Sequence, residues 1–132
     1  MKKTICFLAL AILAGCSSPQ PMATFEQKRP IYNPTLEEVE VSEQKLEAAK
    51  KALKKKLKDP YSAVIEEIYA VQIDGNKDSI SYCGLVNAKN SYGGYTGIKP
   101  FRVTASQTVF LWDQRGEAFN RGITNYCPRL KK

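Results

Sequence analysis

The chain has 132 residues, and its 20 Lys and Arg against 13 Asp and Glu give a formal net charge of +7 at pH 7. This length allows one modest domain with a tail. The sequence contains no histidine, which excludes Ser-His-Asp and Cys-His catalysis and most zinc sites. The positive charge suits an acidic partner or surface, but it is not gathered into a dense basic stripe, so we expect no nucleic-acid partner.

Residues 1–15 have the pattern of a signal peptide. Two lysines are followed by an apolar run of residues 5–13, which is too short to span a bilayer because a spanning helix needs about 20 residues. The run ends in Leu13-Ala14-Gly15-Cys16, which resembles the lipobox of bacterial lipoproteins. The resemblance implies cleavage before Cys16, attachment of diacylglycerol to its thiol, and acylation of its new amine by a fatty acid such as palmitate.

The same resemblance predicts the compartment. In bacterial lipoproteins an Asp after the lipidated cysteine favours retention in the inner membrane, whereas this chain has Ser17. We therefore expect a protein anchored by lipid in the cell outer membrane, with its domain either periplasmic or surface-exposed. Several acyl chains would hold it there stably. Apart from the covalent lipid on Cys16, we expect no cofactor and no metal ion.

Residues 16–34 are predicted to form a tether that begins with the lipidated cysteine. Four prolines remove amide donors and favour extended backbone, and no apolar periodicity is visible. A flexible chain of this length has a root-mean-square reach of about 21–25 Å. We expect the folded domain to occupy residues 35–132.

Residues 35–58 have the pattern of one long amphipathic helix. Thr35 and Glu38 fit a capping box, and Asp59-Pro60 ends the helix because a residue before proline avoids the helical conformation. A narrow apolar stripe recurs at helical spacing and consists of Leu36, Val39, Leu46, Ala49, Leu53 and Leu57. The opposite face is basic and consists of Lys50, Lys51, Lys54, Lys55 and Lys58. Such a face is either solvated or a site for phosphate-bearing lipid.

Four strands are predicted after the helix, separated by turn signals. β-branched and aromatic residues mark them at residues 64–73, 80–88, 98–105 and 108–112. In the second of these, the even-numbered residues from Ile80 to Val86 face one side and the odd-numbered residues face the other. The tail is polar, with a helical turn expected around residues 117–121. We therefore predict an α+β fold in which one N-terminal amphipathic helix packs on a four-stranded antiparallel meander.

The four cysteines have different expected fates. Cys6 is removed with the signal peptide and Cys16 carries the lipid, which leaves Cys83 and Cys127 in the exported domain. Because exported proteins fold in an oxidising compartment, we predict a disulfide between these two residues. Closing a loop of this length stabilises a fold by roughly 4 kcal/mol in the chain-entropy model.

The most unusual stretch is the Gly- and Tyr-rich segment of residues 83–97. With residues 58–63 and 100–101 it reads K-D-P-x-S-A, then C-G-x-V-N-x-K-N-x-x-G-G-Y-x-G, then P-F. This resembles a pattern of small exported bacterial proteins, and the resemblance implies a shared fold without implying an activity. Glycines permit close backbone approach and tyrosines offer flat amphipathic area, as in binding loops. The candidate binding residues are Asn87, Lys89, Asn90, Tyr92, Gly93, Gly94, Tyr95 and Gly97.

A structural explanation of the same segment is also open. In that case the loop is a shaped hairpin connection whose tyrosines pack on the sheet. Asn87 and Asn90 would then form hydrogen bonds with the backbone of the loop.

Three classes of function are considered. We favour a non-enzymatic binding or structural module, whose partner is an envelope protein, peptidoglycan or lipopolysaccharide. A second class is an inhibitor or exclusion factor that inserts the loop of residues 92–97 into a foreign enzyme or secretion component. A third class is an envelope hydrolase that uses Glu66, Glu67 or Asp113. We do not expect an enzyme, because Glu66 and Glu67 are adjacent in a predicted strand and so point to opposite faces.

The anchor can be tested by replacing Cys16. A Cys16→Ser variant has no thiol to lipidate, so we expect it to move from the membrane fraction to the soluble fraction of the envelope, as immunoblotting would show. A Cys6→Ser variant is the matched control and should stay with the membrane. Continued membrane association of the Cys16 variant would contradict the lipoprotein prediction.

Overall fold

The computed structural model describes residues 32–113 and 116–130. The predicted signal peptide, Cys16 and most of the predicted tether lie outside these residues. The elements in chain order are β1 (Leu36–Val39), α1 (Glu43–Lys54), β2 (Val64–Ile73), β3 (Asn76–Asn87), β4 (Lys99–Thr104), β5 (Val109–Leu111), α2 (Glu117–Thr124) and a 3-10 helix, η1 (Pro128–Leu130). Within the two described ranges, no helix has both the length and the apolar character needed to cross a membrane.

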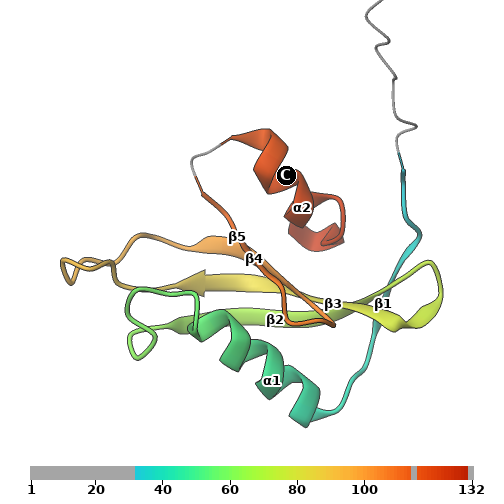
Figure 1. The fold of residues 1–132 in the computed structure, drawn as a ribbon, viewed down its shortest axis with the longest axis horizontal. Helices are drawn as coiled ribbons and strands as arrows, with labels where there is room; N and C mark the ends of the chain where they lie inside the picture. The colour runs from blue at the N-terminus through green and yellow to red at the C-terminus, as the bar shows by residue number, and fades with distance from the viewer. Residues whose placement is uncertain (1–31, 114–115, 131–132) are drawn as a thin grey trace, which may run out of the picture. The chain divides into compact units, whose positions relative to one another are not determined.

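The strands form one antiparallel sheet in the order β1-β2-β3-β4-β5 (Figure 1). The long β2–β3 hairpin is its centre and turns at Asp74 and Gly75. The edge strand β1 pairs with the end of β2 nearest that turn, where Leu36 lies opposite Ile73. At the other end of the hairpin, β4 begins beside Val86.

The predicted fold, a four-stranded sheet with an N-terminal helix, is wrong. The sheet has a fifth strand, β1, and the helix begins only at Glu43, after that strand. Leu36 and Val39 misled the prediction because residues three apart share a face of a helix but point to opposite faces of a strand. Here Leu36 packs on one side of the sheet and Val39 on the other, so the same spacing serves a strand that is covered on both faces.

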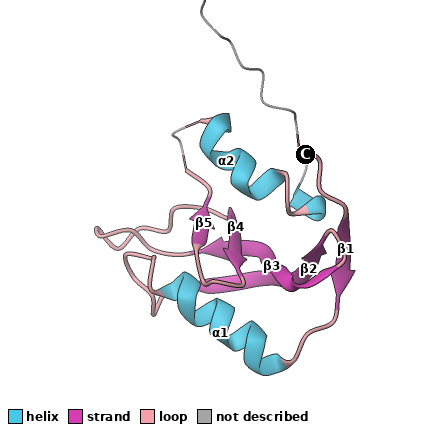
Figure 2. Cartoon of the chain, turned by 45° about the vertical axis from the view of Figure 1, so that its right-hand side comes forward, coloured by secondary structure: helices cyan, strands magenta, loops and turns pink. Residues whose placement is uncertain are grey.

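Each face of the sheet is covered by a different helix (Figure 2). One face packs against α1 and contains the larger core cluster, built from Ala49, Ala52, Leu53, Ala70, Tyr82, Val86, Phe101 and Val103. The other face packs against α2 and the C-terminal tail, and its cluster consists of Tyr69, Val71, Cys83, Ile123 and Cys127. The alternation predicted for residues 80–86 is confirmed, because Tyr82 and Cys83 belong to opposite clusters.

The helix α2 extends the predicted turn of residues 117–121 to Thr124. Asn, Gly and Thr are weak helix formers, so local propensity does not favour this helix. Burial stabilises it instead, since Ile123 is fully buried and Asn120 is buried beside Asp113. A helix of eight residues is marginal by itself, and tertiary contacts must hold it.

The predicted disulfide is confirmed. Cys83 in β3 is bonded to Cys127, with their Cα atoms 5.7 Å apart and a sequence separation of 44. The bond fixes the segment after α2 to the central hairpin. It therefore helps to keep the second face of the sheet covered.

Arg102 also ties α2 to the sheet. Its side chain is buried, and its guanidinium donates hydrogen bonds to Ser81 Oγ (2.9 Å) and to the Gly122 carbonyl oxygen (2.9 Å). The same group lies 3.8 Å from the ring centroid of Tyr126 and 5.3 Å from that of Phe110. Burial lowers the pKa of Arg102 from its ordinary value. The aromatic faces and hydrogen bonds offset the cost of placing this cation in the core.

Gly84 is the position where the central hairpin tolerates no side chain. A Cβ atom there would lie 2.0 Å from the Glu67 carbonyl oxygen and 2.8 Å from the Phe101 ring. Since backbone and a core ring must both move, we expect Gly84→Ala to lower the free energy of unfolding by about 3 kcal/mol or more in urea titrations. Gly94→Ala is the control, because the nearest atom to its Cβ would be 3.8 Å away. Equal stability of the two variants would contradict this packing.

Candidate binding surface at one end of the sheet

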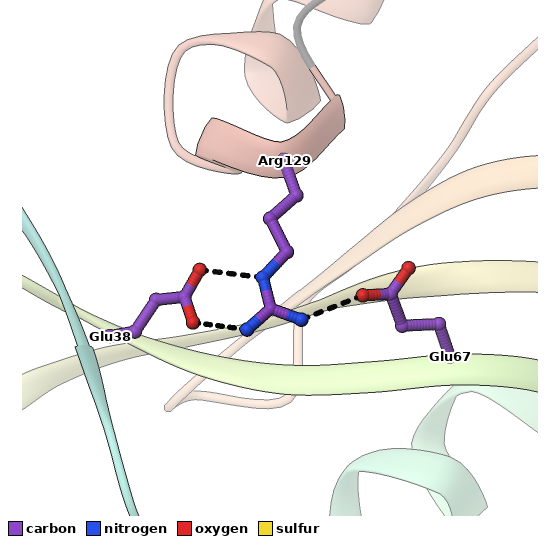
Figure 3. Close-up of polar contacts among 3 residues, drawn as sticks. All are labelled: Glu38, Glu67 and Arg129. Atoms are coloured by element: carbon purple, nitrogen blue, oxygen red, sulfur yellow. Dashed lines mark hydrogen bonds and ion pairs between the residues drawn. The ribbon is translucent and has the colours of Figure 1, made fainter.

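The structure places two carboxylates on one guanidinium, and this bears on the hydrolase alternative. The Nε of Arg129 donates to Glu38 Oε1 (2.7 Å) and its Nη1 donates to Glu67 Oε1 (2.8 Å), while Nη2 bonds Glu38 Oε2 (Figure 3). These hydrogen bonds from Arg129 hold the pKa of Glu38 below its ordinary value of 4.5. An ionised, cation-paired carboxylate is a poor general acid. We interpret the cluster as structural, because it joins the C-terminal segment to strands β1 and β2.

The other two carboxylates of that alternative lie elsewhere. Glu66 is exposed at a bulge in β2, where the register shifts between Ile65 and Glu67. Asp113 follows β5, three strands away from β2, and its backbone exchanges hydrogen bonds with the Asn120 amide. The sequence-predicted carboxylates are therefore not brought together.

The loop of residues 88–98, named here the tyrosine loop, is a short ordered hairpin between β3 and β4. Asn90 organises it: its Oδ1 accepts hydrogen bonds from the N–H groups of Tyr92 (2.9 Å) and Gly94 (3.1 Å). The Asn90 N–H donates to the Gly94 carbonyl oxygen (2.8 Å), and Lys89 bridges to Tyr95 as an antiparallel pair. Gly93 has a φ of 83°, which a side chain would strain. The backbone is thus fixed without the tyrosine side chains.

Three tyrosines are exposed at this end of the sheet. Tyr92 is 95% exposed at the tip of the tyrosine loop, and Tyr95 is 55% exposed on its returning arm. Tyr61 is fully exposed on the neighbouring loop between α1 and β2. The two loops are joined by a hydrogen bond from the Lys89 N–H to Ser62 Oγ (2.9 Å). The structural explanation of this segment required its tyrosines to pack on the sheet. Their exposure shows that they do not.

Asn87 and Gly97 complete the predicted set of binding residues. In the described part of the chain Asn87 Oδ1 is buried and accepts no hydrogen bond, so Asn87 does not support the loop backbone as Asn90 does. Gly97 has a φ of 85° where the loop leads into β4. These residues shape or flank the loop and do not form its exposed surface.

The lysines predicted as one basic face are divided. Lys50 pairs with Glu47 (2.7 Å), and Lys51, Lys54 and Lys55 are exposed along and just beyond α1. Lys58 lies apart from them and lines a cavity of about 220 Å³ beneath the tyrosine loop. Three further lysines line the same cavity, namely Lys56, Lys89 and Lys99. Sequence reasoning missed Lys56 and Lys99, although both flank motifs that it had singled out.

The chain enters the domain at the opposite end of the sheet. The Thr35 N–H donates to Asp74 Oδ1 (2.8 Å), the Asp74 N–H donates to the Thr35 carbonyl oxygen (2.8 Å), and the Tyr32 hydroxyl bonds the same carboxylate. Asp74 lies in the β2–β3 turn, at the end of the sheet opposite the tyrosine loop (Figure 1). The ten residues of β2 span about 30 Å between the two ends.

Comparisons with known proteins give no match to this chain among family models, curated proteins or solved structures. The function is therefore argued from the geometry of the two ends of the sheet.

The Arg129 cluster predicts a specific pH dependence. Because the folded-state pKa of Glu38 lies below its unfolded value of 4.5, the ion pair stabilises the fold above that pH, and this contribution is lost as the pH falls through the folded-state pKa. Arg129→Gln should lower the thermal midpoint at pH 7, and its difference from the wild type should shrink below about pH 4. Arg121→Gln, which removes an exposed arginine from α2, is the control. A difference that stays constant with pH would contradict the assignment.

Proposed function

We propose that this protein is a non-enzymatic binding module of the cell envelope, held at the outer membrane by lipid on Cys16. The observation that carries the proposal is the group of exposed tyrosines on two hydrogen-bonded loops at one end of the sheet. Its partner is another envelope component, namely a protein, peptidoglycan or lipopolysaccharide.

The exposure of these tyrosines supports binding. Large aromatic side chains gathered on a surface are typical of interaction sites, and tyrosine supplies broad contact area at low cost in side-chain entropy. Val64 and Ile98, which are also exposed, add apolar area at the same end. No described hydrogen bond of the tyrosine loop involves a tyrosine side chain. The Tyr95 ring does contact Lys89 Nζ, but folding of the loop gives no reason for the almost fully exposed Tyr92.

The rigidity of the loop supports the same proposal. Its backbone is fixed by Asn90 and by the Lys89–Tyr95 bridge, so binding would not have to order it. A preorganised loop loses less conformational entropy on association than a flexible one, and more of the contact energy appears as affinity.

The point where the predicted tether joins the domain bears on how far this surface can reach. A lipid on Cys16 would connect through the tether to Thr35, at the end of the sheet farthest from the tyrosines. The tyrosine end can then extend about 30 Å beyond the point of attachment. We therefore propose that it can reach a component other than the bilayer that holds the anchor.

The proposal predicts partner capture that depends on exposed tyrosines. With a photo-crosslinking residue at position 64 of the full lipidated chain, Tyr61→Ala/Tyr92→Ala should lose the cross-linked adducts formed in cells. Because both side chains are exposed, the free energy of unfolding should change by no more than about 0.5 kcal/mol.

Tyr32→Ala is the control for this experiment, since it removes an exposed tyrosine from the opposite end of the sheet. Its adducts should match those of the parent chain. Adducts that survive the double substitution would refute the proposal, and a large loss of stability would show that the tyrosines are structural.

A further inference from the structure

Four lysines from three separate segments converge on one cavity. Lys56 and Lys58 follow α1, Lys89 follows β3, and Lys99 begins β4. Within residues 32–113 and 116–130, no carboxylate lines this cavity of about 220 Å³ and none of the four lysines has an ion-pair partner. Gathering like charges raises the free energy of the fold, and a bound anion would lower it.

Ordinary structural reasons account for only part of this arrangement. Lysines near the C-terminus of a helix complement its dipole, which is a sufficient reason for Lys56 and for its neighbours on α1. The dipole does not explain Lys89 and Lys99, which come from strand ends. The hollow along α1 that Lys50, Lys51, Lys54 and Lys55 line also contains Glu47, whereas no carboxylate among the described residues lines this cavity.

The size and lining of the cavity limit what it can hold. Sites for drug-sized ligands occupy about 300–1,000 Å³, so this cavity suits one small group of a larger molecule. Lysine ammonium groups are common phosphate ligands. Asn90 and Thr96 also line the cavity. The Asn90 Oδ1 is already engaged by the loop backbone, which leaves its amide N–H groups as donors.

An aromatic ring adjoins the lysines. The Nζ of Lys89 lies 5.3 Å from the ring centroid of Tyr95, and Tyr95 is about half exposed. Its free ring surface therefore lies next to the charged cavity. A flat aromatic face of this kind suits the apolar face of a sugar ring.

We propose that this cavity binds a phosphate group carried by a sugar, with the phosphate among the four lysines and the sugar ring on Tyr95. The inference rests on the proposed binding function and names its class of ligand. The same phosphate chemistry exists in lipid headgroups, but the tether joins the opposite end of the sheet, which favours a saccharide outside the anchoring bilayer.

Binding can be measured by calorimetry on the full lipidated chain in phosphatidylcholine nanodiscs. Glucose 6-phosphate should bind more tightly than inorganic phosphate, and glucose should not bind. Lys89→Gln/Lys99→Gln should weaken glucose 6-phosphate by about tenfold, because two of four charges are removed. Tyr95→Ala should reduce the affinity for glucose 6-phosphate to that for inorganic phosphate.

Lys51→Gln/Lys54→Gln is the matched control, since it removes the same charge from exposed positions of α1. It should bind like the parent chain. Equal weakening in both double variants would show general electrostatic attraction and overturn the proposal, as would the absence of phosphate binding.

Co-sedimentation with phosphatidylglycerol vesicles separates the two sources of phosphate. Binding to these vesicles without binding to glucose 6-phosphate would assign the cavity to lipid and overturn the saccharide proposal. The cross-linking experiment keeps the two proposals apart. Tyrosine-dependent adducts without sugar-phosphate binding would leave the proposed function standing and remove this ligand. Sugar-phosphate binding without tyrosine-dependent adducts would keep the cavity as a binding site and remove Tyr61 and Tyr92 as the surface that captures a partner.

Discussion

The disulfide between Cys83 and Cys127 joins the central hairpin to the segment that follows α2. A helix of eight residues is not stable by itself in water. The stability of α2 therefore depends on this disulfide and on the contacts of Arg102 and Arg129. The buried Arg102 donates a hydrogen bond to the Gly122 carbonyl oxygen of α2. The exposed Arg129 joins the C-terminal segment to Glu38 in β1 and Glu67 in β2. Without this segment the cluster around Val71 would lie open to water.

A sheet covered on both faces gives the loops at its end a firm base. The β2–β3 hairpin is long, tightly packed at Gly84, and bounded by α1 on one side and by the tail on the other. The tyrosine loop follows β3 directly. Hydrogen bonds to Asn90 Oδ1 fix the backbone of this loop beyond the end of the sheet. The lysine cavity lies where the end of α1, the end of β3 and the start of β4 meet. The exposed tyrosines and the lysine cavity therefore both depend on the packing of the end of α1, the end of β3 and the start of β4 against one another.

Local patterns predicted much of this structure. The ends of β2, the alternation along β3 and the pairing of Cys83 with Cys127 all follow from residue types and spacing. The edge strand β1 was missed because its apolar spacing also fits a helix. Only the first turn of α2 was predicted, because the stability of its second half comes from burial rather than propensity. The Glu38–Arg129 pair joins residues 91 positions apart, and such contacts have no local signal. The lysine cavity was missed for the same reason.

The attachment of the entering chain to Asp74 has a mechanical consequence. If the anchor pulls at Thr35 while a partner holds the tyrosine loop, the tension runs along the strands. Force along β1 then shears its pairing with β2, so the hydrogen bonds between them resist together and do not open one after another. The Arg129 cross-link between Glu38 and Glu67 spans the same two strands. The pairing of β1 with β2 is thus arranged to resist a load applied between Thr35 and the tyrosine loop.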